Sequence, residues 1–161
     1  MEQVLIADWE NPAHAEAVVY LLNEYSSDEM GAGKALSDDV KANLIPELKK
    51  RPHVFAVLAF EDETPAGLAL CVEGFSSFAC KPLVNIHDVI VPRSFRGKGI
   101  SKRLLQKVEE TALDRGCCKL TLEVLEGNEI AKSAYIAFGF EGYVLDDKNG
   151  KALFWQKKLV H

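Results

Sequence analysis

The sequence predicts one mixed α/β domain over residues 1–161, with the element order β-α-α-β-β-β-α-β-α-β-β. Two observations support this fold class. Short runs of apolar and β-branched residues alternate with stretches whose apolar residues recur every three or four positions, as on one face of a helix. Glycine and proline mark most boundaries between them, and no repeat, low-complexity tract or linker interrupts the series.

The first third is expected to form one strand and two helices. Val4–Ala7 has strand composition, and Asn11 with Pro12 is typical of a helix start. The apolar residues at helical spacing behind them are Ala15, Val18, Val19 and Leu22. A polar, glycine-bearing loop leads to a second helix over about residues 37–50, which Pro46 should kink or split.

A β-hairpin and a third strand are expected in the middle. Val54–Phe60 and Ala66–Phe75 are rich in apolar residues and flank a short turn, as the two strands of a hairpin do. The third strand is Val84–Val91, and a helix then runs from about residue 100 to Gly116. Its apolar stripe consists of Ile100, Leu104, Leu105, Val108 and Ala112.

The last third is expected to add a strand, a helix and a closing pair of strands. Residues 119–124 have strand composition, and a helical pattern over residues 128–138 stops at Gly139. Two closing strands, at about residues 141–145 and 152–159, flank an Asn-Gly pair that is typical of a tight turn.

Composition and charge exclude some classes of function. A 48% hydrophobic and 27% charged composition is ordinary for a globular protein, and the net charge of -5 argues against a nucleic-acid partner. The beginning of the chain has no basic segment and no apolar run approaches the length of a membrane span, so we expect a cytoplasmic protein without a membrane partner. The cysteines are Cys71, Cys80, Cys117 and Cys118. They form no C-x-x-C pair, so we expect reduced, mostly buried thiols and no metal site.

The most informative segment is the turn between the third strand and the following helix. Gly97 and Gly99 let the backbone approach a ligand closely, and the helix directs its free N–H groups and positive dipole end at the same place. Such a place suits an anion such as a phosphate. The turn is positively charged, although the net charge of the whole chain is negative. Its basic residues are Arg96, Lys98, Lys102 and Arg103.

Two nucleotide-binding motifs do not fit. The dinucleotide fingerprint fails because Lys102 stands where its third glycine belongs. The P-loop pattern fails at Gly31–Lys34, because Asp28 occupies the first glycine position and no strand leads into it. We interpret residues 31–34 as a flexible loop.

Two sequence blocks resemble the GNAT superfamily of N-acetyltransferases. The family's acyl-coenzyme-A motif reads Gln/Arg-x-x-Gly-x-Gly/Ala, and residues 96–101 match it, with Ser101 in place of the final small residue as a possible helix cap. The second block, Asn-x-x-Ala-x-x-x-Tyr-x-x-x-Gly-Phe, is matched by Asn128, Ala131, Tyr135, Gly139 and Phe140. Within the superfamily, the pattern is most similar to the diamine and small-amine acetyltransferases.

The resemblance implies a GNAT-type acyl-CoA N-acyltransferase fold and an enzyme with acetyl-CoA as co-substrate. An acetyl group would pass to the primary amine of a small, for example polyamine-like, molecule by direct attack on the thioester. The coenzyme would be bound by Val89, Ile90, Val91, Arg96, Gly97, Lys98, Gly99, Ile100, Ser101, Lys102 and Asn128. The resemblance also implies a homodimer.

Two catalytic residues follow from the same resemblance. Tyr135 matches the tyrosine that donates a proton to the coenzyme thiolate, although its spacing also fits a residue of the apolar helix face. His87 stands where the diamine acetyltransferases carry an acidic residue, and its imidazole suits a general base or a hydrogen-bonded sheet residue. Asp88 should face the opposite side by strand alternation and receives no role. Asn128 can equally cap a helix.

The sequence leaves alternatives open for the acceptor molecule and for the activity. Acidic residues around the first two helices would favour a cationic amine, although Asp38 and Asp39 also suit the first turn of a helix. The acidic set is Glu24, Asp28, Glu29, Asp38 and Asp39. A coenzyme-A-binding module without turnover and acetylation of a protein amine are the alternative functions.

Overall fold

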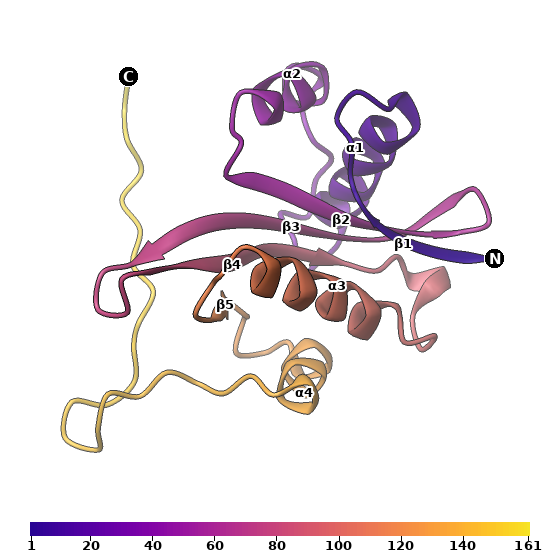
Figure 1. The fold of residues 1–161 in the computed structure, drawn as a ribbon. Helices are drawn as coiled ribbons and strands as arrows, with labels where there is room; N and C mark the ends of the chain where they lie inside the picture. Colours follow the sequence, from indigo (N-terminus) through magenta and orange to yellow (C-terminus); the bar gives the residue numbers. More distant parts are fainter.

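The computed structural model describes residues 1–161 and has a five-stranded sheet at its centre, in the order β1-β2-β3-β4-β5 (Figure 1). Neighbouring strands are antiparallel except for the parallel pair β4–β5. The strands are β1 (Glu2–Ile6), β2 (Val54–Glu61), β3 (Thr64–Ser76), β4 (Lys81–Ile90) and β5 (Leu120–Leu122). The mixed α/β class predicted from the sequence is confirmed.

Helices cover both faces of this sheet. On one face lie α1 (Pro12–Ser27) and α2 (Asp38–Lys49), and on the other lie α3 (Ile100–Asp114) and α4 (Glu129–Phe138) (Figure 1). A 3₁₀ turn, η1 (Arg93–Phe95), joins β4 to α3. None of the helices has the length and apolarity that a membrane span requires.

The two faces of the sheet have separate hydrophobic cores. Successive side chains of a strand point to opposite faces, so Val57 packs toward α3 while Leu58 packs toward α1, and both are fully buried. The stripe predicted for α3 is buried along its whole length, from Ile100 to Ala112. The central strands therefore hold α1 and α3 in fixed positions on either side of β4.

Two sequence predictions concern the helices α1 and α2: a cap at the start of α1 and a break within α2. Asn11 caps α1 by accepting a hydrogen bond from the Ala13 N–H, as predicted. Of the kink or split predicted at Pro46, the split is wrong, because α2 continues as one helix through that residue. Leu48, beyond the proline, is buried in the core and holds the last turn in place.

The two closing strands predicted at residues 141–145 and 152–159 are wrong, because residues 141–161 form no strand. The tight turn itself forms: Gly150 has φ +75°, and Val144 and Lys151 make an isolated antiparallel bridge. Beyond the turn the chain runs past the end of the sheet as a segment without secondary structure (Figure 1). Strand composition alone creates no strand where the backbone has no hydrogen-bonding neighbour.

Candidate functional site

The strand β4 carries a bulge at His87. Leu70 of β3 pairs with Asp88 while its neighbour Cys71 pairs with Ile86, so His87 is the extra residue. The packing of the side chains also shows the bulge. In a regular strand, residues three positions apart point to opposite faces, but Ile86 and Val89 both pack toward α3. The bulge therefore turns both His87 and Asp88 toward the α1 face of the sheet.

This geometry corrects the expectation that strand alternation places Asp88 opposite His87. His87 is exposed, with Nδ1 3.4 Å from Oδ1 of Asn85. Asp88 is half-buried, and this burial raises the pKa of its carboxyl, while the neighbouring His87 lowers it to a smaller extent. Sequence reasoning missed Asp88 as a site residue; the signal was an acidic residue inside an apolar strand.

Next to the bulge, β4 and β5 separate. They pair only at three positions, Val84–Ile86 with Leu120–Leu122, and Asn85 donates a side-chain hydrogen bond to Thr121 at 3.0 Å. The strand predicted over residues 119–124 is thus shorter in the structure. Beyond Ile86, β4 is paired only to β3, so the opposite edge of residues 87–90 is open. The predicted coenzyme-binding residues Val89 and Ile90 lie on this open stretch, and Val91 follows directly after the end of β4.

Both glycines of the turn between β4 and α3 adopt the left-handed conformation. Gly97 and Gly99 have φ angles of +78° and +77°, which L side chains rarely adopt, and Gly99 is the N-cap of α3. The cap makes no side-chain hydrogen bond, so the expectation that Ser101 caps the helix is wrong. The side chain of Ile100 is buried in the core, which leaves only its backbone for a ligand.

A row of backbone donors is free at this turn. The first N–H group of α3 with a backbone acceptor belongs to Arg103, which donates to the Gly99 carbonyl oxygen at 3.3 Å. The N–H groups of residues 97–102 donate to no acceptor in the protein. Free donors at a helix N-terminus, together with the helix dipole, form a site for an anion.

The basic side chains around the turn are mostly paired with acidic ones. Lys98 contacts Glu61 at 3.0 Å, and Arg103 forms an ion pair with Glu2. Arg96 donates from Nε to the Val91 carbonyl oxygen at 3.1 Å and lies 3.7 Å from Asp28. Lys102 is exposed and forms no ion pair. Such surface pairs contribute little stability, so an incoming anion can compete for the cations.

Tyr135 lies on α4 and is half-buried. Its ring meets Phe140 edge to face, with centroids 5.9 Å apart, and it packs against the core on the α3 side. Burial raises the pKa of the Tyr135 phenol, and Tyr25 raises it further. The phenol therefore stays protonated at neutral pH, as a proton donor requires.

Tyr25 is a second tyrosine at the site, which the sequence did not single out. It lies in the last turn of α1 and donates a hydrogen bond to the Met30 carbonyl oxygen at 3.3 Å. Burial raises its pKa, as do the negative charges of Asp88 and Asp28. Asp88 on β4 thus contributes to the raised pKa of Tyr25, and Tyr25 contributes to the raised pKa of Tyr135 on α4.

Asn128 caps α4, because its Oδ1 accepts a hydrogen bond from the Ala131 N–H at 3.2 Å. The interpretation as a helix cap is confirmed. A second role toward a coenzyme stays a prediction.

The acidic residues around the first two helices, predicted to favour a cationic amine, lie in different settings. Asp28 lies 3.7 Å from both Arg93 and Arg96, beside the glycine turn. Asp38 and Asp39 occupy the first turn of α2, where a carboxylate stabilises the helix dipole. The other members, Glu24 and Glu29, are exposed.

The cysteines are all free, as predicted, but their burial was predicted wrongly. Cys71 is buried, which raises its pKa to about 12 and keeps the thiol neutral. Cys80 and Cys118 are exposed because they lie outside the core, in a hairpin turn and beyond the end of α3. No three metal-ligating side chains gather anywhere in the protein.

Comparison with known sequences finds relatives that are named as acetyltransferases. A family model described as "Acetyltransferase (GNAT) family" matches residues 15–140. The chain is 28% identical to thialysine N-epsilon-acetyltransferase of Caenorhabditis elegans over 124 residues, 77% of this chain and 75% of the relative. It is 41% identical to the protein of the same name from Bos taurus over 56 residues, 35% of this chain and only 33% of the relative. With aminoglycoside N(6')-acetyltransferase type 1 of Salmonella typhimurium it shares 25% identity over 118 residues, 70% of this chain and 75% of the relative.

Solved structures share the fold at lower identity. A probable acetyltransferase superposes with a TM-score of 0.80 at 18% identity, covering 98% of this chain and 99% of the other. An aminoglycoside N-acetyltransferase in complex with CoA superposes with a TM-score of 0.75 at 20% identity, covering 99% and 96%.

Proposed function

The chain belongs to the acetyltransferase (GNAT) family, and we propose that it transfers an acetyl group from acetyl-CoA to the primary amine of a small molecule. Membership in this family agrees with the acetyl-CoA-dependent N-acetyltransferase predicted from the sequence. Relatives named for thialysine and for aminoglycosides support a small amine as the acceptor. The observation that carries the proposal is the row of free N–H groups at residues 97–102, beside the open edge of β4.

The coenzyme would lie across these two features. Its diphosphate accepts hydrogen bonds from the backbone of residues 97–102, with the unpaired Lys102 adding charge. Its pantetheine arm, which carries amide groups, pairs with the open edge of β4 at Val89 as an added strand would, and with the Val91 N–H just beyond the strand, because the Val91 carbonyl oxygen is already bonded to Arg96. Asn128, at the start of α4, is the remaining residue expected to contact the coenzyme.

The chemistry requires no covalent enzyme intermediate. The neutral amine attacks the thioester carbonyl carbon, and a backbone N–H on the open edge near Val89 stabilises the developing oxyanion. The positively charged nitrogen of the tetrahedral intermediate releases a proton to solvent. As the intermediate collapses, the carbon–sulfur bond breaks and the coenzyme leaves as a thiolate. Tyr135 donates its phenolic proton to that sulfur, and solvent returns a proton to the phenolate. Proximity of the two reactants supplies much of the rate gain.

The amine arrives as an ammonium ion and must lose a proton before it attacks. His87 and Asp88 lie together on the α1 face because of the bulge, so His87 can accept this proton while Asp88 attracts the cation. Replacing His87 by Ala should remove the acidic limb of the pH–rate profile. An unchanged profile would exclude His87 as the base and leave Asp88 as the candidate.

Two measurements test the function. Calorimetry should show that coenzyme A binds the purified protein, and a free-thiol assay with acetyl-CoA should show turnover with at least one amine among a diamine, a polyamine, thialysine and an aminoglycoside. Binding of coenzyme A without thiol release from any amine or peptide would favour a binding module. Acceptance of a peptide N-terminus alone would favour a protein substrate. Absence of coenzyme binding would overturn the proposal.

The remaining sequence predictions stay predictions. They are a cytoplasmic location, a homodimer, no metal, and no nucleic-acid or membrane partner.

A further inference from the structure

The guanidinium group of Arg103, in the first turn of α3, binds two partners at once. Its Nε donates to Oε1 of Glu2, and its Nη2 donates to Oε2 of the same carboxylate at 2.6 Å, so the two groups form a two-pronged ion pair. Nη2 also donates to the Lys98 carbonyl oxygen at 2.8 Å. Arg103 is half-buried, while its neighbour Lys102 is exposed. The Arg103 side chain therefore connects strand β1 to the turn before α3.

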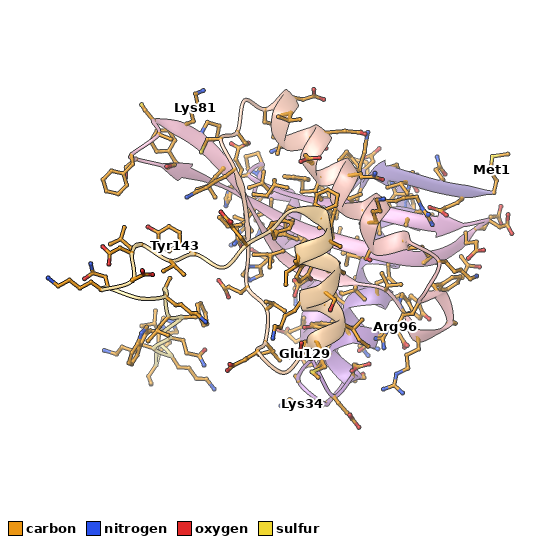
Figure 2. All side chains as sticks on the ribbon, turned by 90° about the horizontal axis from the view of Figure 1, so that it is seen from below. Met1, Lys34, Lys81, Arg96, Glu129 and Tyr143 are labelled. Carbon is orange, nitrogen blue, oxygen red and sulfur yellow. The ribbon has the colours of Figure 1, made fainter.

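Glu2 lies at the end of β1 that is next to this turn. In Figure 1 the start of β1 and the turn before α3 occupy the same end of the sheet, and Figure 2 shows Met1 and Arg96 at that end and Lys81 at the other. Alternation along β1 puts Glu2 on the same face as Val4, which packs toward α3. The Glu2 carboxylate thus meets α3 from the sheet.

A second carboxylate lies opposite Glu2. Its cross-strand partner in β2 is Glu61, which contacts Lys98 at 3.0 Å. Two like charges directly opposite each other destabilise a sheet, and here each of them is paired with a cation. The two pairs differ, because Lys98 donates hydrogen bonds to Glu61 only, whereas Arg103 binds both a carboxylate and the backbone. An incoming phosphate can therefore draw away Lys98 more easily than Arg103.

Arg103 fixes both peptide groups that flank Gly99. Its side chain binds the Lys98 carbonyl oxygen, and its backbone N–H donates to the Gly99 carbonyl oxygen at 3.3 Å. No peptide bond of the protein is cis, and the C=O and N–H groups of a trans peptide point in opposite directions. Because both carbonyl groups are directed at Arg103, the N–H groups of Gly99 and Ile100 are directed away from it. Both belong to the free donors of residues 97–102.

Gly99 also leaves room for the guanidinium group. A Cβ at Gly99 would stand 3.2 Å from Nη1 of Arg103, which is tighter than an ordinary contact. Glycine is therefore favoured here for two reasons: its φ angle is +77°, and Arg103 occupies the space that a side chain would need.

We infer that Arg103 is a positioning residue of the proposed coenzyme site: held by Glu2, it directs the N–H groups of Gly99 and Ile100 toward the diphosphate and does not itself bind a phosphate. This role rests on the proposed function, in which the diphosphate lies at residues 97–102. It also explains a carboxylate beside an anion site. By its charge alone Glu2 would repel the coenzyme, but as the anchor of Arg103 it strengthens coenzyme binding.

Two variants that remove the same charge from opposite positions distinguish these effects. Glu2→Ala releases Arg103 and should weaken coenzyme A binding by about tenfold, because two N–H donors lose their fixed direction. Glu61→Ala is the matched control, since it releases Lys98 instead, and it should bind coenzyme A at least as tightly as the wild type. Calorimetry measures both affinities. Equal or tighter binding by Glu2→Ala would overturn the role of Arg103.

The dependence on salt separates a positioning residue from a phosphate-binding cation. Arg103→Met should weaken coenzyme A binding by a similar factor at low and at high salt. Lys102→Met, which removes the unpaired cation beside it, should weaken binding at low salt only, because salt screens an exposed charge. A loss in Arg103→Met that disappears at high salt would show that Arg103 binds the phosphate directly, and would overturn the positioning role.

A measurement without coenzyme tests the contact itself. In protein labelled with 15N-glycine, the Gly99 resonance reports the hydrogen bond at the Lys98 carbonyl oxygen, because both atoms belong to one peptide group. Glu2→Ala and Arg103→Met should move this resonance, and Lys102→Met should leave it in place.

The outcomes distinguish this role from the proposed function. A Gly99 resonance that stays in place in Arg103→Met would overturn the positioning role alone, even if the wild-type protein binds coenzyme A. A wild-type protein that does not bind coenzyme A would overturn the proposed function, and the role of Arg103 toward a diphosphate with it.

Discussion

Gly67 of β3 lies directly under Ile100, the first residue of α3: a Cβ at Gly67 would stand 2.8 Å from Cγ2 of Ile100. The same Cβ would stand 3.0 Å from Leu104 Cδ1. The missing side chain therefore allows the first turn of α3 to settle on the sheet. This contact positions the free N–H groups of residues 97–102 beside the end of β4.

Replacing Gly67 by Ala should destabilise the protein and weaken coenzyme binding together. Overpacking of this kind costs about 1–3 kcal/mol, and it pushes the start of α3 away from β4. Gly74→Ala in the same strand is the control, because its Cβ would meet Leu83 Cδ1 at an ordinary 3.5 Å. Denaturant unfolding and calorimetry with coenzyme A measure the two effects. Equal behaviour of the two variants would contradict the packing argument.

Replacing Gly97 by Ala should weaken coenzyme binding more than its effect on stability suggests. The new side chain meets no atom within 4 Å, so the effect comes from the φ angle of +78° alone. A left-handed alanine costs about 1 kcal/mol, and a turn that relaxes to avoid it misplaces the N–H groups, which predicts roughly tenfold weaker binding. Gly142→Ala, where the backbone is unstrained and the space is open, should change neither quantity.

Replacing Tyr135 by Phe should lower kcat by roughly 100-fold and leave the KM for acetyl-CoA unchanged, since only the proton donor is lost. The edge-to-face contact with Phe140 does not need the hydroxyl, so the free energy of unfolding should change little. Steady-state kinetics with the best amine checks the prediction. Tyr20→Phe, on the exposed side of α1, should retain full activity. Wild-type turnover in Tyr135→Phe would assign the tyrosine to the apolar helix face alone.

Replacing Asp88 by Asn should stabilise the protein at neutral pH while lowering kcat/KM. The native pKa of Asp88 lies above that of the unfolded chain, which is about 3.9. As pH rises through this window the unfolded state loses the proton first, so Asp88 makes stability fall with rising pH. The difference in unfolding free energy between wild type and Asp88→Asn should therefore grow from pH 3 upward and become constant above the native pKa. A pH-independent difference would show that the burial of the charge has no cost.

Much of the local structure could be predicted from the sequence. The caps at Asn11 and Asn128, the positive φ angles at Gly97 and Gly99, and the buried stripe of α3 each depend on a few residues close together in the chain. The order of elements through α4 follows from the same local patterns. These are properties that side-chain volume, hydrogen-bonding groups and helical spacing determine over one or two turns.

The tertiary structure alone decided three features. They are the bulge at His87, the separation of β4 from β5 and the position of residues 141–161. Each of them is a relation between segments far apart in the chain. The sequence Ile86-His87-Asp88 does not show that Cys71 pairs with Ile86 while Leu70 pairs with Asp88, and residues 152–159 do not show which edge, if any, they can reach. Sequence determined which segments can be strands, helices and an anion-binding turn. The register of backbone hydrogen bonds decided which side chains meet and which edges stay free.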